Sequence, residues 1–288
     1  MKEKIFLALI VIFLISCAPN AIPGDIPSNK DPAVKNFDET HQDEMENLPK
    51  TDTITVQNFN VDVSNVESSM ANYGPATGFL AYPKRGTNYP AVVMIHEWWG
   101  LNDNIKNMAK QLASEGYVVL AVDLYNGKVA NSSEEAGKLM SSATKAPGIA
   151  VANMKSAINF LKKQENVDKN RIATMGWCFG GGMSLQLSLN ENVNATVIYY
   201  GSLVTNESKL SSIKWPVLGF FGEKDQAIPV QSARDFDKAL DDLKVKNDIN
   251  YYPNVGHAFA NPSGSNYAPN EAKDAWAKTL KFLDENLK

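Results

Sequence analysis

From residue 51 onward, short continuous apolar runs alternate with longer stretches in which apolar residues recur at helical spacing. Ala91–Ile95 and Val118–Val122 are continuous apolar runs, which are typical of strands buried on both faces. Between them, Asn104–Glu115 has an apolar stripe of helical period and is followed by Gly116, a common helix stop. Strand–helix units of this kind predict a mainly parallel sheet.

The same alternation continues to the end of the chain. Further strands are expected at Arg171–Gly176, Ala195–Tyr200, Val217–Gly222 and Ile249–Tyr252, and further helices at Pro147–Gln164, Gly180–Leu189, Val230–Leu243 and Glu271–Asn286. The helix from Pro147 is expected to pack through Ile149, Ala152, Ile158 and Leu161. Before these units, Thr53–Val63 and Ala76–Pro83 predict antiparallel edge strands. We therefore expect one α/β domain over residues 51–288, with a mostly parallel central sheet and helices on both faces.

The first 17 residues have the pattern of a targeting segment. Lys2 and Lys4 precede the apolar run Ile5–Ile15, which is too short to span a bilayer comfortably and favours a signal peptide. The run ends in Leu14-Ile15-Ser16-Cys17, which resembles the lipobox of bacterial lipoproteins. That resemblance implies lipidation of Cys17 and an extracytoplasmic location on a membrane. The alternative is a plain secretory signal with an incidental cysteine, and hence a secreted protein.

Residues 18–50 combine five prolines with many polar residues and few large apolar ones. Such a composition cannot bury enough apolar surface to fold, so we expect a disordered tether. His41 lies within this segment and is expected to be solvated.

Composition and charge exclude several classes of function. The 288-residue chain has a net charge of -4 and no cluster of Lys and Arg, which argues against a nucleic-acid partner. It contains neither a glycine-rich phosphate loop nor a dinucleotide fingerprint. With three histidines and no metal-ligand cluster, a zinc site is not expected. We predict no cofactor and no metal.

The strongest local motif is Gly176-Trp177-Cys178-Phe179-Gly180-Gly181, directly after one predicted strand and before a helix. This is the arrangement of a nucleophile elbow, a sharp turn that holds one side chain out over the sheet. The usual serine is replaced by Cys178, whose thiol would gain thiolate character from the helix N-terminus and a nearby imidazole. The alternative is a buried structural cysteine in a glycine-rich turn.

Two more residues follow strands in the order expected for a catalytic triad. Asp225 follows the Val217–Gly222 strand, and His257 follows the Ile249–Tyr252 strand. The order nucleophile, acid, histidine is that of α/β-hydrolases, and in an open parallel sheet sites form at these carboxyl ends. Alone, Asp225 could cap a turn and His257 could be a satisfied surface histidine, but together with Cys178 they predict a triad.

The loop His96-Glu97-Trp98-Trp99-Gly100 follows the Ala91–Ile95 strand, where an α/β-hydrolase supplies its second oxyanion donor. The backbone N–H groups of Trp98 and Phe179 are the expected pair. Glu97 is positioned to hydrogen-bond the resting thiol, although it could instead form a loop salt bridge. His96 is expected to be a packed neighbour of the site.

Five segments together resemble the dienelactone hydrolase family, the carboxymethylenebutenolidases: His96-Glu97-Trp98-Trp99-Gly100, Ala121-Val122-Asp123-Leu124-Tyr125, Gly176-Trp177-Cys178-Phe179-Gly180-Gly181, Tyr199-Tyr200-Gly201 and Gly256-His257-Ala258-Phe259. The resemblance covers roughly residues 53 to 288. It implies an α/β-hydrolase fold, a monomer, and hydrolysis of small ester or lactone bonds through Cys178, Asp225 and His257 with an acyl-enzyme intermediate. It also implies that Glu97 accepts the thiol proton when substrate displaces it.

The chain departs from the family where a dienelactone carboxylate is bound. Gly127 and Asn261 stand where family members have arginines, and Lys128 offers only a point charge without a bidentate fork. The expected substrate-binding residues are Trp99, Tyr125, Trp177 and Phe259, which with Trp98 suggest an apolar or aromatic substrate. Ordinary core packing is the alternative for some of them.

Two other functions compete with hydrolysis. The protein could be a non-catalytic lipoprotein that binds a small apolar ligand in its pocket. It could also be a redox-active thiol protein, since an activated cysteine outside the cytoplasm is prone to oxidation. Ester turnover that is lost on Cys178→Ala distinguishes the hydrolase from the first, and a dependence on His257 distinguishes it from the second.

Overall fold

The computed structural model describes residues 53–56, 59–74 and 76–288. The predicted signal peptide, the predicted lipidation site Cys17 and the predicted tether over 18–50 lie outside these residues. Within the described part of the chain, no helix has both the length and the apolar character that a membrane crossing requires.

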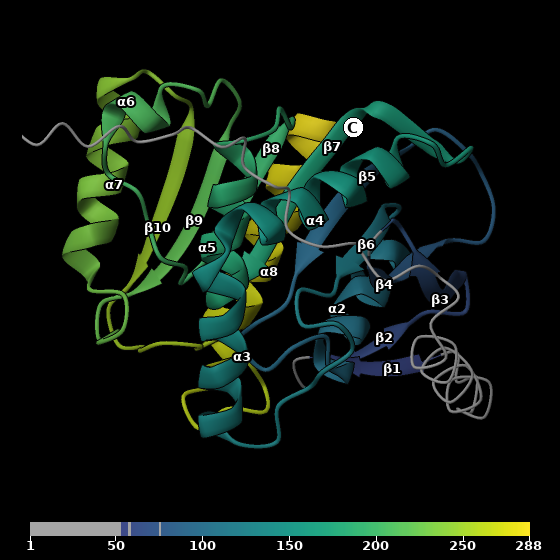
Figure 1. The fold of residues 1–288 in the computed structure, drawn as a ribbon, viewed down its shortest axis with the longest axis horizontal. Helices are drawn as coiled ribbons and strands as arrows, with labels where there is room; N and C mark the ends of the chain where they lie inside the picture. The colour runs from purple at the N-terminus through teal and green to yellow at the C-terminus, as the bar shows by residue number, and fades with distance from the viewer. Residues whose placement is uncertain (1–52, 57–58, 75) are drawn as a thin grey trace, which may run out of the picture. The chain divides into compact units, whose positions relative to one another are not determined.

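An eight-stranded sheet forms the centre of the domain (Figure 1). Its order is β10-β9-β8-β7-β5-β6-β4-β3, and β4 alone runs opposite to the other strands. The strands are β3 Val66–Asn72, β4 Thr77–Pro83, β5 Tyr89–Ile95, β6 Val118–Val122, β7 Val167–Trp177, β8 Ala195–Tyr199, β9 Val217–Gly222 and β10 Asn247–Tyr252. Every residue of β6, β8 and β9 is buried, as the continuous apolar runs predicted.

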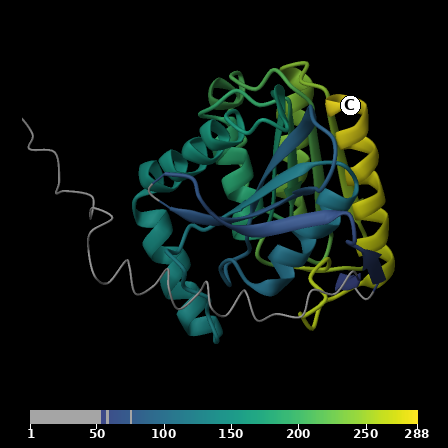
Figure 2. The ribbon, with the colours of Figure 1, turned by 90° about the vertical axis from the view of Figure 1, so that its right-hand side faces the viewer.

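Helices cover both faces of this sheet, which confirms the predicted architecture. Figure 2 shows α8 on one face and the helices α3 and α4 on the other. The helices are α2 Asp103–Ser114, α3 Ser133–Lys145, α4 Pro147–Leu161, α5 Phe179–Ser188, α6 Glu207–Leu210, α7 Val230–Asp242 and α8 Pro269–Leu287. The α2 helix begins one residue before its predicted start: Asn102 is its N-cap, and the Asn102 side chain accepts a hydrogen bond of 3.2 Å from Ile105 N.

The amino-terminal strands differ from the prediction. Thr53–Val63 was expected to be one edge strand, but it contains β1 Thr53–Val56 and β2 Phe59–Asp62, which pair in a separate two-stranded sheet. The edge of the main sheet is β3, which the sequence pattern did not reveal. Most β3 side chains are partly or fully exposed, so this strand lacks the apolar signature of the inner strands.

The predicted face of α4 is partly wrong. Ile158 and Leu161 are buried as expected, but Ile149 is 73% exposed and Ala152 is also exposed. The buried face is instead formed by Ala150, Met154, Ala157, Ile158 and Leu161, which recur at helical spacing. Ile149 lies in the first turn after Pro147, on the side of the helix that faces away from this stripe.

Candidate active site

Cys178 occupies a sharp turn between β7 and α5. Its φ of 55° and ψ of -119° are unfavourable for a residue with a side chain and cost of the order of 1–3 kcal/mol. Hydrogen bonds on both sides hold the turn, since Cys178 N donates to Tyr199 O at 3.0 Å and Gly182 N donates to Cys178 O at 3.2 Å. This is the conformation that the nucleophile-elbow motif predicted.

The glycines around Cys178 are required by close backbone approaches. A Cβ atom on Gly176 would overlap the Gly180 carbonyl, and a Cβ atom on Gly180 would overlap the Ile95 carbonyl. The start of α5 therefore packs directly onto the end of β5, the strand next to β7 in the sheet. This packing fixes Cys178 beside the loop that begins at His96.

Cys178, His257 and Asp225 form a continuous hydrogen-bonded row. His257 Nε2 lies 3.0 Å from Cys178 Sγ, and His257 Nδ1 lies 2.8 Å from Asp225 Oδ2. The three residues follow β7, β10 and β9, at the carboxyl edge of the sheet. His257 lies 32 positions after Asp225 and 79 positions after Cys178, so the fold brings together three residues that are far apart in the sequence.

The Asp225 carboxylate is buried and firmly oriented. Its Oδ1 accepts hydrogen bonds from Ala227 N at 2.8 Å and Ile228 N at 2.9 Å, which leaves Oδ2 for His257. Burial alone would lower the pKa of His257, but its hydrogen bonds to Asp225 and Cys178 and the charges of both outweigh this and raise the pKa to about 10. The imidazole is thus set to hold a proton next to the sulfur.

Glu97 lies at the end of β5 and is 3% exposed. Its carboxylate oxygen Oε2 accepts a hydrogen bond of 2.5 Å from Asn261 Nδ2, and its predicted bond to the Cys178 thiol is not formed. Burial raises the pKa of Glu97 to about 7, against the opposing effects of the His257 charge and of the donors Asn261 and Tyr200. Glu97 also forms no salt bridge with any residue in the described part of the chain.

The orientation of Asn261 is fixed by its own turn. Asn261 Oδ1 accepts a hydrogen bond of 2.9 Å from Ser263 N, so the amide nitrogen must face Glu97. The residue is 6% exposed and lies four positions after His257. Sequence reasoning placed Asn261 where family members have an arginine but did not identify it as the partner of Glu97. The close spacing to His257 was the available signal.

His96 is fully buried and packs as expected. Its Nε2 accepts from Leu124 N at 3.2 Å, so Nδ1 carries the proton and donates to Glu97 O at 2.6 Å. Burial lowers the pKa of His96, which keeps the ring neutral. His96 therefore supports the backbone at Glu97. Within the described ranges, no group of three or more His, Cys, Asp or Glu side chains is placed to hold a metal ion.

The predicted oxyanion donors flank Cys178. Phe179 is the first residue of α5, so its N–H has no acceptor within the helix. Trp98 follows β5 and is partly exposed, and its ring packs edge-on against Trp99 with 5.1 Å between centroids. Both residues thus lie in the loops that meet at the elbow, and their function as donors stays a prediction.

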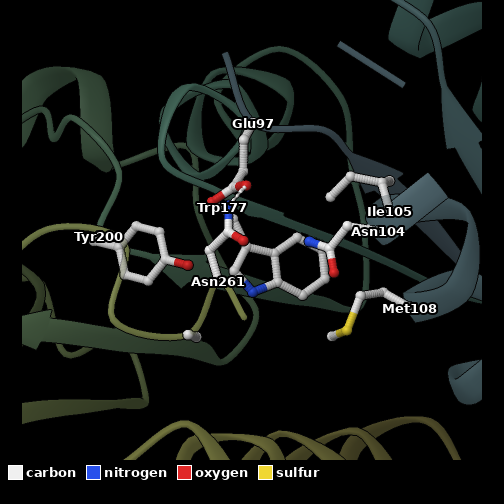
Figure 3. Close-up of a pocket in the computed structure, with 8 residues that line it drawn as sticks. Glu97, Asn104, Ile105, Met108, Trp177, Tyr200 and Asn261 are labelled. Atoms are coloured by element: carbon white, nitrogen blue, oxygen red, sulfur yellow. Dashed lines mark hydrogen bonds between the residues drawn. The ribbon is translucent and has the colours of Figure 1, made fainter. Parts of the chain in front are cut away.

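The four residues expected to bind substrate occupy different environments. Trp99 is partly exposed, whereas Tyr125 is 6% exposed and stacks on Phe179. Trp177 is 3% exposed and lies beside Glu97 and Tyr200 (Figure 3). Phe259 has no exposed surface and packs between Tyr200 and Tyr252, as expected for a core residue, so its contact with a substrate stays a prediction.

Comparison with known proteins gives a consistent family. The model of the dienelactone hydrolase family matches residues 76–287. Protein usf of Aquifex pyrophilus is 33% identical over 217 residues, which cover 73% of this chain and 93% of that protein. A Saccharolobus solfataricus protein named "Putative carboxymethylenebutenolidase" is 31% identical over 240 residues, covering 71% and 92% of the two chains.

Solved structures share the fold. A dienelactone hydrolase-like promiscuous phosphotriesterase from metagenomic libraries superposes with a TM-score of 0.71 at 22% sequence identity. The superposition covers 77% of this chain and 98% of that chain. At this identity the likeness shows the α/β-hydrolase fold alone.

Proposed function

Because the chain belongs to the dienelactone hydrolase family, we propose that it hydrolyses small esters or lactones through Cys178, His257 and Asp225. The observation that carries this proposal is the unbroken row from Asp225 Oδ2 through the His257 ring to Cys178 Sγ, with contacts of 2.8 and 3.0 Å. A nucleophile, a base within hydrogen-bonding reach and a group that orients the base are the parts that covalent acyl transfer needs.

In the first half of the reaction, the Cys178 sulfur bonds to the substrate carbonyl carbon, and the carbon–oxygen bond to the leaving group then breaks. His257 donates its proton to the leaving oxygen, and an acyl group remains on the sulfur. In the second half, a water molecule gives its proton to His257 and attacks the acyl carbon, which releases the acid and restores the thiolate. The N–H groups of Trp98 and Phe179 stabilise the negative oxygen of each tetrahedral intermediate.

We expect an uncharged ester or lactone to be the better substrate. The side chain at position 261 is a neutral amide that is already bound to Glu97, so it offers no free cation to a substrate carboxylate. Lys128 is exposed and belongs to the loop after Tyr125. The half-exposed rings of Trp98 and Trp99 supply apolar surface next to the elbow, which favours an apolar or aromatic group on the substrate.

A panel of esters, lactones and thioesters with the purified full-length chain tests the proposal. Wild type is compared with Cys178→Ala, whose circular dichroism spectrum and melting temperature serve as checks of folding. We expect at least one substrate class to be turned over by wild type only. Equal rates for the two proteins across the panel would leave the nucleophile without support and would favour a ligand-binding function.

We also propose that Cys17 is lipidated and anchors the protein to a membrane outside the cytoplasm. The support is the basic start, the short apolar run and the Leu14-Ile15-Ser16-Cys17 sequence. Mass spectrometry of the mature amino terminus is expected to find an acylated Cys17, and Cys17→Ser is expected to release the protein from membranes. A mature chain with an unmodified Cys17 would contradict the anchor.

A further inference from the structure

A small cavity lies between Glu97 and the first two turns of α2. Its volume is about 10 Å³, close to the space that one water molecule needs. It is lined by Glu97, Asn104, Ile105, Met108, Trp177, Tyr200, Ala260 and Asn261. Neither Cys178 nor His257 lines it.

The Tyr200 hydroxyl is a buried polar group at this cavity. Tyr200 has no exposed surface, and its hydroxyl contacts the Glu97 carboxylate and the Ala260 backbone, but neither contact has the geometry of a well-aligned hydrogen bond. Figure 3 shows the hydroxyl of Tyr200 and the side-chain amide of Asn104 pointing inward from opposite sides. A buried hydroxyl left wholly unpaired costs about 1–3 kcal/mol, so a better-aligned hydrogen-bonding ligand at this poorly paired hydroxyl is favourable.

The cavity opens at the amino-terminal end of α2. Seven of its eight lining residues are buried, and only Asn104 keeps appreciable exposure to solvent. Asn104 lies in the first turn of α2, a helix that contributes none of the three triad residues. Since neither Cys178 nor His257 lines the cavity, we take the opening at α2 to be distinct from the approach of a substrate to Cys178.

We propose that one water molecule occupies this cavity, bound by Tyr200, Asn104 and Glu97, and that Glu97 exchanges its proton with solvent through this rear route. Three polar side chains are within the two to four partners that a buried water requires. In the exchange, the Glu97 O–H bond breaks as the water takes the proton, and the water passes one proton to bulk water beyond Asn104. The reverse sequence returns a proton to the carboxylate.

This route gives the site a second connection to solvent. A substrate or acyl group on Cys178 closes the front of the site, but Glu97 keeps its exchange with solvent at the rear. The use of that exchange during turnover rests on the proposed hydrolysis at Cys178 and His257. The water and the route themselves can be tested without any substrate.

Rapid-mixing infrared spectroscopy of the full-length chain in D2O tests the route directly. Near pH 5 Glu97 is protonated, and its C=O stretching band is assigned by its loss in Glu97→Gln. We expect Asn104→Leu and Tyr200→Phe each to slow hydrogen–deuterium exchange of that band by about tenfold, the effect of losing one hydrogen bond of roughly 1.4 kcal/mol. Asn107→Leu is the matched control, because Asn107 lies on α2 but does not line the cavity. Exchange in this variant is expected to match wild type.

Alkylation of Cys178 with iodoacetamide then closes the front of the site. The proposal predicts that exchange at Glu97 continues at the wild-type rate in the alkylated protein. Exchange that is blocked by alkylation and unaffected by Asn104→Leu would overturn the rear route. A high-resolution crystal structure with no water between Tyr200 and Glu97 would overturn the water site. Neither result depends on ester turnover, so failure of the proposed hydrolysis is recognised separately, by the Cys178→Ala panel.

Discussion

The buried Glu97 carboxyl makes a specific prediction about stability and pH. The side chain is 3% exposed, its hydrogen-bond donor is the neutral amide of Asn261, and burial raises its pKa from 4.5 to about 7. At about 1.4 kcal/mol for each pKa unit, this difference corresponds to about 3 kcal/mol between the folded and unfolded states. Glu97→Gln removes the titration while it keeps the size and the acceptor oxygen of the side chain.

The sign follows from proton binding. Between pH 4.5 and about 7 the folded protein holds a proton on Glu97 that the unfolded chain releases, so the contribution of Glu97 to stability falls as pH rises through this window. The free energy of unfolding of Glu97→Gln, relative to wild type, is therefore expected to increase by about 2–3 kcal/mol between about pH 5 and about pH 8.

Urea denaturation of both proteins at the two pH values measures this difference, because other groups that titrate in the same range cancel in the comparison. Glu165→Gln is the matched control: Glu165 is an exposed glutamate between α4 and β7, and its substitution is expected to leave the pH dependence unchanged. A wild type and a Glu97→Gln variant with parallel pH dependences would refute the conclusion that burial dominates at Glu97.

Three further predictions concern the triad and the elbow. Asp225→Asn is expected to lower kcat by about a thousandfold or more with little change in KM, since the His257 ring loses the carboxylate that orients it; steady-state kinetics measure this. Gly180→Ala is expected to destabilise the fold by about 1–3 kcal/mol in urea denaturation because its Cβ would overlap the Ile95 carbonyl, whereas Gly137→Ala, with open space in α3, is expected to stabilise it by about 0.5–1 kcal/mol. His257→Gln is expected to lose stability relative to wild type below about pH 6.5, and this loss should shrink as pH rises toward about 10, the raised pKa of the folded state; a constant difference would contradict that pKa.

Much of the fold could be predicted because its inner strands are buried on both faces. Continuous apolar runs are typical of strands whose faces both avoid water, and the predicted bounds of Val118–Val122 and Val217–Gly222 match β6 and β9 to the residue. The other inner strands were predicted with errors of one to four residues at their ends. The edge strand β3 and the helix α3 were missed because their exposed surfaces leave little periodic apolar signal. Local pattern also could not separate β1 from β2, which pair with each other in a separate sheet and not with the main sheet.

The candidate site, like the fold, could be predicted only in part. The positions of Cys178, Asp225 and His257 followed from strand ends and chain order, which depend on topology alone. The direction of each neighbouring side chain depends on packing that no local pattern encodes. Glu97 bonds to Asn261 instead of the thiol, and Phe259 is fully buried although it follows His257 by only two residues.

The claim that Cys178 is the nucleophile is tested most directly by titrating it with iodoacetamide. Peptide mass spectrometry gives the alkylated fraction at Cys178, separately from Cys17, and ester turnover is measured on the same samples. If Cys178 is the nucleophile, the fraction of activity lost equals the fraction of Cys178 alkylated throughout the titration. Full turnover by protein whose Cys178 is completely alkylated would contradict it.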